Sequence, residues 1–400
     1  TIKVIWIQMN RVKLILWLGF FLRLVLAFYN GFVGPTYGSG DDALGFHFVA
    51  VDVSQDFVTD VFVLTYIYPY LLGLFYFITT DSLFLGSALS ALGWLASAFI
   101  LLGIMRILSF NMLYQSRVML IYALIPTSLM YTSVTLREPF QLLFINLAIY
   151  AALKIYFHRS NAHWFLLFLA IVGMGAMHGA LLAFGVFIIA GTLFLLTSRN
   201  RKGVSFTKVV LVTPIVILCL FYGFELFMSL TSYGDRLDDG LSTAVQVYQE
   251  GTLSDAYDAR ANYRSEVTIN NGLGGLILSL PYFLFQYLFE PMPWNISSIV
   301  DVVSLLENVL RFWLIWNALK YLVGTYLNKP MFVAHNAFGN RRFYLFIFLS
   351  YLLIESLWSL GTSNWGTASR HHVPSLGLLL VVGFAYRNVI STKYNSSHKS

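Results

Sequence analysis

The sequence predicts an all-α integral membrane protein with about ten transmembrane helices. Of its 400 residues, 58% are hydrophobic and only 11% are charged, and the mean hydropathy is +0.71. A soluble domain is about 25% charged, so this composition cannot cover a water-exposed surface. Apolar runs near 20 residues recur along the whole length, and each is long enough to cross about 30 Å of hydrocarbon as a helix. We therefore expect a single transmembrane domain over residues 1–400.

The apolar runs, read between their polar flanks, give the spans in chain order. The first run ends without a small-residue cleavage site and contains Arg23, so we expect a true span rather than a signal segment that is removed. The predicted spans cover residues 13–32, 83–105, 117–134, 139–157, 163–177, 179–197, 207–230, 302–327, 342–359 and 373–388.

The charged residues indicate which loops face which side of the membrane. With the N-terminus in the cytoplasm, most lysines and arginines fall in cytoplasmic loops, as the positive-inside rule requires. The arginines of the outer loops are Arg137, Arg236, Arg260, Arg264 and Arg370, and most of the loop acids fall on the same side. Both ends of the chain are therefore expected in the cytoplasm. The net charge of +6 then reflects topology, and no nucleic-acid partner is expected because the basic residues form no stripe.

Two further apolar stretches, residues 58–79 and 272–293, would reverse this charge distribution if both crossed the membrane. Their aromatic residues suit the membrane interface, and the prolines in each stretch suit a broken backbone. We expect interfacial or re-entrant helices here, and two ordinary extra spans are the alternative. The stretches belong to a first outer loop over residues 33–80 and a large outer loop over residues 231–301.

The first outer loop contains Asp41, Asp42 and His47 in the sequence GSGDDALGFH. A carboxylate at the membrane surface can act as a general base towards a hydroxyl group, or it can hold a divalent cation such as magnesium or manganese. A solvated acidic loop without a chemical role is the alternative. We therefore treat Asp41 and Asp42 as candidate catalytic residues and as candidate metal ligands, with His47 as a candidate substrate contact.

Arg137 and Glu138 lie in the segment LREPF, residues 136–140, which connects two predicted spans on the outer side. Charges at the mouth of a helical bundle must face water, a partner or a cavity. The segment is accordingly a candidate site, with Arg137 and Glu138 as its candidate residues and Arg137 as a candidate substrate contact. A turn built on Pro139 is the alternative.

Arg370, His371 and His372 precede the last predicted span, again on the outer side. An arginine offers a forked set of donors that matches a phosphate group, so this cluster suits a phosphate at the headgroup level of the membrane. The alternative is that Arg370 only anchors the chain at the membrane interface.

For the other charged or titratable residues considered, pairing or packing is an explanation that needs no functional role. Arg260 and Arg264 are four residues apart and would share one side of a helix, where they could bind pyrophosphate or pair with nearby acids. Glu307 and Arg311 have the same spacing within a predicted span, and we expect them to neutralise each other. His178 is expected to be packed by small neighbours.

Several chemistries find no support in the sequence. It contains no GKS or GKT phosphate loop, no CxxC pair and no HExxH motif, and Cys219 is its single cysteine. Nucleotide hydrolysis, dithiol redox chemistry and zinc-protease chemistry are therefore not indicated.

The order of features resembles the GT-C superfamily. These are membrane glycosyltransferases that use polyprenyl-phosphate-linked donors, including protein mannosyltransferases and lipid A aminoarabinose transferases. The likeness runs over about residues 13–200. It comprises a first span, an outer loop with Asp42 in a D-x-x-x-[FYH] setting, the interface segment YPYLLGLFY, a span that ends in a basic residue, and the outer turn REP.

This resemblance implies inverting transfer of a sugar from a polyprenyl-phosphate donor to a glycan, lipid or protein acceptor on the outer face of the membrane. Asp42, with Asp41 as its near rival, would be the catalytic acid of the first outer loop, and Glu138 the acid of the second. The segment RHHVP, which begins at Arg370, is similar to the arginine-containing segment that contacts the lipid phosphate in several members. Some members use a divalent cation and others do not. The expected location is a bacterial inner membrane, with the site facing the periplasm or exterior.

Two other functions stay open on the sequence alone. A polymerase or ligase that joins lipid-diphosphate-linked glycans, of the O-antigen polymerase type, would also use outer arginines beside a hydrophobic groove. A lipid or polysaccharide transporter would instead string ionisable residues through its spans.

Overall fold

We describe the protein from a computed structural model, which describes residues 2–36, 38–56, 67–199, 261–262, 272–327 and 340–397. The described part is built from helices and contains no strand, only an isolated bridge between Asn262 and Asn364. Several of the helices are long and apolar enough to cross a membrane. The prediction of an all-α membrane protein is therefore confirmed for this part of the chain.

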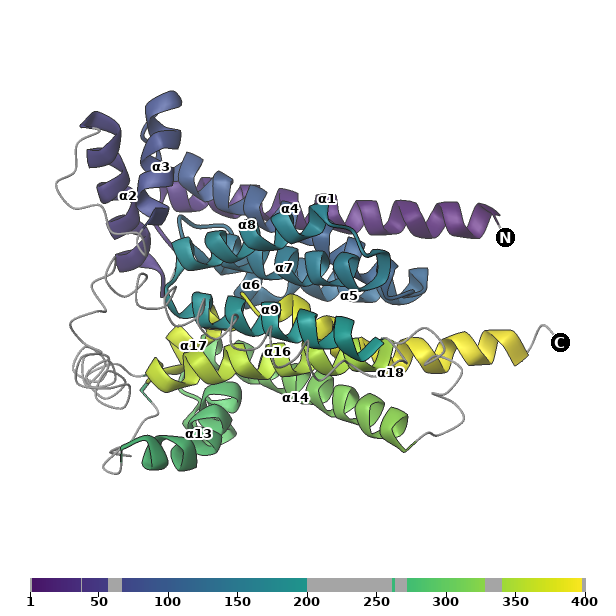
Figure 1. Ribbon diagram of the computed structural model, residues 1–400. Coiled ribbons are helices and arrows are strands. Elements are labelled where there is room, and N and C mark those ends of the chain that lie inside the picture. The colour runs from purple at the N-terminus through teal and green to yellow at the C-terminus, as the bar shows by residue number, and fades with distance from the viewer. Residues whose placement is uncertain are drawn as a thin grey trace.

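The long helices run side by side along the molecule (Figure 1). The short helices α2, α3, α13 and α17 lie at its left-hand end, which we call the α2–α17 end, and both chain termini lie at the opposite end. The elements are α1 (Ile2–Phe32), α2 (Gly40–Gln55), α3 (Ile67–Ile78), α4 (Leu83–Ile107), α5 (Met112–Leu124), α6 (Pro126–Tyr131), α7 (Glu138–His158), α8 (Ala162–Met177), α9 (Ala180–Arg199), α13 (Gly272–Phe289), η2 (Pro293–Asn295), α14 (Ile299–Tyr326), α16 (Asn340–Gly361), α17 (Trp365–His371) and α18 (Leu376–Ser397).

Five helices among the described residues are long and apolar enough to span a membrane, or six if the bent pair α17–α18 counts as one span. The prediction of about ten spans is therefore not confirmed. Helix α8 has only 16 residues, and α14 is long enough but carries Glu307, Arg311 and Lys320 along its length. The predicted span over residues 207–230 lies outside the described residues.

The predicted span over residues 117–134 is broken in the structure. Helix α5 ends at Leu124, and α6 starts again at Pro126. Proline lacks a backbone N–H and disfavours helical geometry in the preceding residue. Ile125 accordingly has a ψ of 124°, which turns the chain between the two helices.

A buried arginine holds this break against α1. Arg23 is fully buried and donates to the carbonyl oxygens of Gly19 and Ala123 at 3.0 and 2.8 Å and to Thr132 Oγ1 at 2.7 Å. Its guanidinium also lies 3.6 Å from the ring centre of Trp94. Carbonyl oxygens at the end of α5 need donors because helical bonding stops there. Arg23 therefore completes the helix end rather than pairing with another charged residue of the spans.

Glu307 and Arg311 do not form the ion pair that their spacing predicts. Glu307 accepts from the backbone N–H and the hydroxyl of Thr127 at 2.9 and 2.5 Å. Arg311 donates to the Leu288 carbonyl at 2.8 Å and to Asn308. The break before α6 exposes the Thr127 N–H, and α13 ends beside Arg311, so tertiary partners replace the local one.

The two leftover apolar stretches contain short helices. Helix α3 packs on α2 so closely that a side chain at Gly73 would meet Val53 at 2.6 Å, and it exposes Leu71, Leu74 and Phe77. Helix α13 contains a proline and likewise exposes apolar residues. Their location in the membrane interface stays a prediction.

Candidate functional site

Asp42 is placed by the start of α2. Gly38 has a φ of +78°, which suits glycine, and the chain turns there into a helix whose first turn contains Asp41 and Asp42. Carboxylates are stabilised at a helix N-terminus by the unpaired backbone N–H groups. The side chain of Asp42 is half exposed, at 50% of its free area. It therefore lies at the mouth of the bundle, where a substrate hydroxyl could reach it.

Glu138 is placed by the start of α7. Pro139 occupies the first turn of that helix, where its missing N–H does no harm. The Glu138 side chain is only 2% exposed, and its Oε2 has no hydrogen-bond partner within the described part of the chain. The turn at Pro139 and the candidate site are therefore not alternatives, because Pro139 starts the helix that places the buried Glu138 carboxylate.

Arg370 is placed by the last turn of α17. Asn364 caps this short helix by accepting from the Thr367 N–H at 2.7 Å, and the Trp365 indole N–H donates to Asp301 Oδ1 at 2.9 Å. Asp301 is fully buried at the start of α14. These contacts fix α17 against α14, and so they fix the direction from which Arg370 enters the site.

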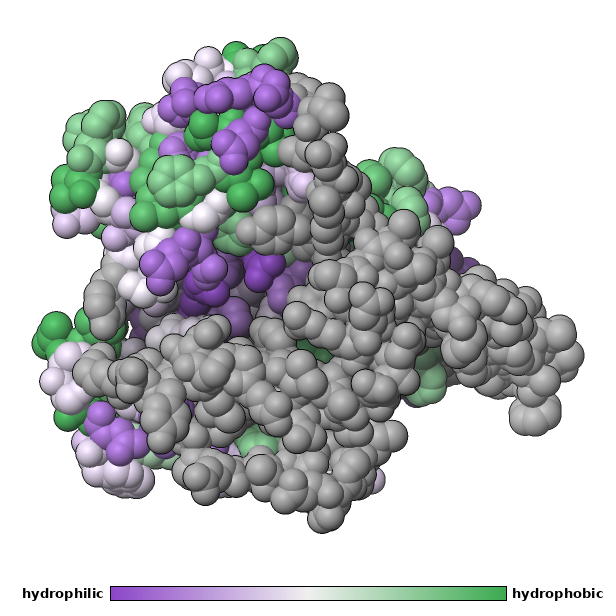
Figure 2. Space-filling view, turned by 90° about the vertical axis from the view of Figure 1, so that its left-hand side faces the viewer, coloured by the Kyte–Doolittle hydropathy of each residue, from purple (hydrophilic) through white to green (hydrophobic). Residues whose placement is uncertain are grey.

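Asp42, Glu138 and Arg370 meet at the α2–α17 end. The Arg370 guanidinium forms an ion pair with Asp42, and its Nε lies 2.9 Å from Glu138 Oε1. The three residues come from α2, α7 and α17. Figure 2 looks onto this end and shows hydrophilic residues gathered in a hollow beneath hydrophobic ones. We call these three residues the acid–arginine cluster.

The cluster holds two carboxylates and one guanidinium, and Arg370 itself is only 13% exposed. Ion pairs with a charged hydrogen-bond donor are strong in such a poorly hydrated position, and each buried charge needs its partner. Arg370 therefore orients the more exposed carboxylate, Asp42, while Glu138 holds Arg370 from the buried side.

Arg137 lies beside the cluster but has different contacts. It is half-buried at the start of α7, donates weakly to the Met177 carbonyl at 3.4 Å, and lies 5.7 Å from the ring centre of Phe46. No carboxylate of the described residues pairs with it.

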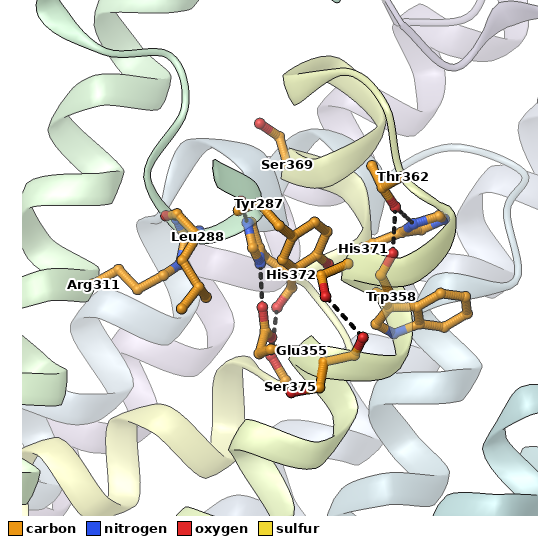
Figure 3. A network of polar contacts seen from close by, with 12 residues as sticks. Tyr287, Leu288, Arg311, Glu355, Trp358, Thr362, Ser369, His371, His372 and Ser375 are labelled. Atoms are coloured by element: carbon orange, nitrogen blue, oxygen red, sulfur yellow. Dashed lines mark hydrogen bonds and ion pairs between the residues drawn. The ribbon is translucent and has the colours of Figure 1, made fainter. Parts of the chain in front are cut away.

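His371 and His372 do not join Arg370 in one donor set, contrary to expectation, and their rings face Trp358, Thr362, Glu355 and Tyr287 instead (Figure 3). The ring of His371 stacks on Trp358 with 4.4 Å between centres, and its Nδ1 lies 3.3 Å from the Thr362 hydroxyl. His372 Nδ1 lies 2.6 Å from Glu355 Oε2, and its Nε2 lies 3.1 Å from the Tyr287 carbonyl. Both ring nitrogens of His372 are thus used inside the bundle.

Glu355 is the centre of this internal network. It is fully buried on α16, pairs with His372 and accepts from the Ser375 hydroxyl. His372 and Ser375 flank the bend of 74° between α17 and α18, and Pro374 lies between them. The network borders a small cavity that is also lined by Glu307, Arg311 and Tyr351. The Glu355 network stabilises the bend between α17 and α18, and therefore also the position of α17, which carries Arg370.

His47 joins α2 to α3. Its Nδ1 lies 3.0 Å from the Tyr76 hydroxyl, and their rings are 5.5 Å apart. Burial lowers the pKa of His47, with the charge of Asp81 opposing the shift. The neutral His47 ring therefore links α2 to α3 through Tyr76, rather than contacting the acid–arginine cluster.

The remaining predicted site features are placed only in part by the structure. Arg260 and Arg264 lie outside the described residues. Asp41 is exposed beside Asp42. Among the described residues, no group of three or more histidine, cysteine or acidic side chains is arranged to hold a metal ion, and Asp42 is already paired with Arg370. We derive no step through a metal.

No family model, no curated protein and no solved structure matches this chain.

One residue at this end, His178, was not predicted as a site residue. His178 ends α8, and its ring lies 4.5 Å from that of Trp358, whose other neighbour is His371. The available signal was the helix break at the sequence MHGA, since glycine beside a polar residue at the end of an apolar run marks a helix terminus. This helix break does not reveal that the His178 ring lies at the same end of the molecule as Arg137.

Proposed function

We propose that this protein is a membrane glycosyltransferase that moves a sugar from a polyprenyl-phosphate-linked donor to a hydroxyl acceptor, as the resemblance to the GT-C superfamily implies. The observation that carries the proposal is the meeting of Asp42, Glu138 and Arg370 at one end of an apolar bundle. A half-exposed carboxylate, oriented by a buried arginine, has the form of a general base at the level where a lipid-linked donor would present its sugar.

In the proposed reaction, the acceptor oxygen attacks the anomeric carbon of the donor sugar from the face opposite the phosphate. The new C–O bond forms as the bond from that carbon to the phosphate oxygen breaks, so the anomeric configuration inverts. The acceptor proton passes to Asp42, and polyprenyl phosphate leaves with the bonding electron pair. Arg370 keeps Asp42 aimed at the acceptor, and Glu138 keeps Arg370 in place.

The proposal includes a location. The α2–α17 end would face the periplasm or exterior of a bacterial inner membrane, with about ten spans in the whole chain. Chain termini that lie at the opposite end fit this topology. Labelling of a cysteine introduced at the exposed Asp52 of α2 by a membrane-impermeant reagent in intact cells tests it, and protection of that cysteine would reverse the orientation.

The catalytic proposal is tested with the full-length protein in liposomes that contain polyprenyl-phosphate monosaccharides and a membrane extract as the source of acceptor. Release of polyprenyl phosphate is measured for the wild type, Asp42→Asn and a control, Asp52→Asn, which changes an exposed acid of the same helix. A parallel arm with polyprenyl-diphosphate oligosaccharides distinguishes the polymerase or ligase alternative. Loss of turnover in Asp42→Asn alone supports the proposal, and equal turnover in all three proteins contradicts it.

A further inference from the structure

Among the described residues, Arg137 has no acidic partner, and it lies at the end where the proposed reaction takes place. Its contacts are the Met177 carbonyl at 3.4 Å, which is long for a hydrogen bond to a charged donor, and the Phe46 ring at 5.7 Å. Arg370, by contrast, lies between two carboxylates. Within the described part of the chain, this half-buried guanidinium has unused donors and lacks the partner that usually accompanies such a charge.

His178 provides a neutral donor next to Arg137. The carbonyl to which Arg137 donates belongs to Met177, the residue before His178. The His178 Nδ1 accepts from the Ala180 N–H at 3.2 Å. In a neutral imidazole the other nitrogen then carries the proton, so Nε2–H is a donor. Within the described residues, that N–H has no hydrogen-bond partner.

The surroundings keep His178 neutral and its ring fixed. Burial lowers its pKa well below the usual value of 6.5, and the positive charges of Arg137 and Arg370 lower it further. The ring lies edge-to-face against Trp358, with 4.5 Å between centres. A fixed ring with an N–H donor, next to an uncompensated guanidinium, is suited to a phosphate oxygen.

The charges around Arg370 disfavour the same role for it. Asp42, Glu138 and Arg370 together carry one net negative charge, so a phosphate that approached Arg370 would be repelled or would have to displace a carboxylate. Arg137 offers a full positive charge without that competition. Because like charges at close range in a poorly hydrated site are costly, the phosphate is expected on the Arg137 side.

We propose that Arg137 and the Nε2–H of His178 form the subsite that binds the phosphate of the lipid donor, while Arg370 acts as a positioning residue for Asp42. This rests on the proposed function for the identity of the lipid, but the anion subsite itself rests on the contacts of Arg137 and His178. It also divides the two outer arginines between different tasks: one binds the leaving phosphate and the other aims the base.

Binding measurements on the full-length protein in nanodiscs test the assignment. The probes are farnesyl monophosphate, farnesol and inorganic phosphate, and the readout is the dissociation constant by titration calorimetry. A hydrogen bond to a charged group contributes about 1.5–3 kcal/mol, so Arg137→Gln is expected to weaken farnesyl monophosphate binding by about 10- to 100-fold. Arg137→Lys, which keeps the charge, is expected to recover part of this loss.

Substitutions at His178 test the second donor without changing charge. His178→Ala is expected to weaken binding by about threefold to tenfold, as loss of one neutral hydrogen bond does. His178→Gln is expected to restore it, because the glutamine amide can place an N–H near the position of Nε2. Arg117→Gln on α5 is the matched control, since Arg117 is exposed and its guanidinium lies 5.1 Å from the centre of the Tyr114 ring.

Arg370→Gln separates the two tasks. It is expected to bind farnesyl monophosphate within about threefold of the wild type while losing turnover, with a raised acceptor KM or a lowered kcat. Loss of binding in Arg370→Gln with wild-type binding in Arg137→Gln would overturn the assignment and leave the proposed function standing. Arg137-dependent binding of inorganic phosphate, with no gain from the farnesyl chain, would keep the anion subsite and contradict a lipid donor. Absence of any phosphate binding in the wild type would overturn both.

Discussion

Arg370 forms an ion pair with Asp42, although 328 positions separate the two residues along the chain. The pair brings α17, near the end of the described chain, onto the first turn of α2. The same guanidinium reaches Glu138 at the start of α7. Segments from three separate parts of the chain are thereby joined through one side chain.

The contact between α2 and α17 is expected to be detectable by cross-linking. Cys219 is the only native cysteine, so Cys219→Ser gives a background in which Asp42→Cys and Arg370→Cys can be combined. A short bifunctional thiol reagent should join the two and change the mobility of the denatured protein. Asp52→Cys with Arg370→Cys is the control pair and should react far less. Equal cross-linking of both pairs would show that α17 does not lie on the first turn of α2.

Removal of Arg370 is expected to destabilise the protein through Glu138. Glu138 is buried, and Arg370→Ala leaves its charge without the guanidinium. Breaking a buried pair in this way typically costs about 3–5 kcal/mol. The thermal unfolding midpoint of Arg370→Ala should therefore fall, and Glu138→Gln in the same protein should recover part of the loss. No recovery in the double variant would mean that the two residues do not share one environment.

The low pKa of His178 gives a prediction for stability as a function of pH. The folded protein keeps His178 neutral, whereas the unfolded chain protonates it near its usual pKa of 6.5, so the unfolded state binds more protons in acid. Stability from this group is full above pH 6.5 and is lost as the pH falls below it. The unfolding midpoint should drop between pH 7.5 and 5.5, and His178→Gln should reduce that drop. An unchanged pH profile in the variant would contradict a neutral His178 in the folded protein.

Glu355 is expected to matter for stability more than for donor binding. Its carboxylate holds His372 and Ser375 on either side of the α17–α18 bend. Glu355→Ala should lower the unfolding midpoint strongly, because it leaves the buried partners unsatisfied, at about 1–3 kcal/mol each. Ser356→Ala, a half-buried neighbour on the same helix, should change it little. A large loss of farnesyl monophosphate binding in a folded Glu355→Ala protein would instead place Glu355 in the site.

The sequence was informative wherever a pattern had one physical meaning. Composition indicated a membrane protein, and the sorting of charges predicted that Asp42, Glu138 and Arg370 face the same side. It could not show that they touch, because that contact depends on how α2 and α17 pack. It also could not separate Arg370 from His372, which are two residues apart. The end of α17 and the following bend at Pro374 turn His372 towards Glu355 inside the bundle.

Other features depended on tertiary partners that no local pattern contains. The spacing of Glu307 and Arg311 predicts an ion pair, but Thr127 becomes available only because Pro126 breaks the helix before it. In the same way, His178 reads as a packed helical residue until the contacts of Arg137 and Trp358 are known. The predicted number of spans is not confirmed within the described residues, because α14 carries charged residues along its length and α8 is short.

The measurement that tests the central claim most directly is release of polyprenyl phosphate from a polyprenyl-phosphate sugar by the reconstituted protein. The wild type and Asp52→Asn should turn over at similar rates, and Asp42→Asn should be slower by at least about 100-fold, the lower range for loss of a general base. All three proteins must show the same unfolding midpoint within error. Turnover of Asp42→Asn at the wild-type rate, or consumption of only a diphosphate-linked donor, would contradict the account.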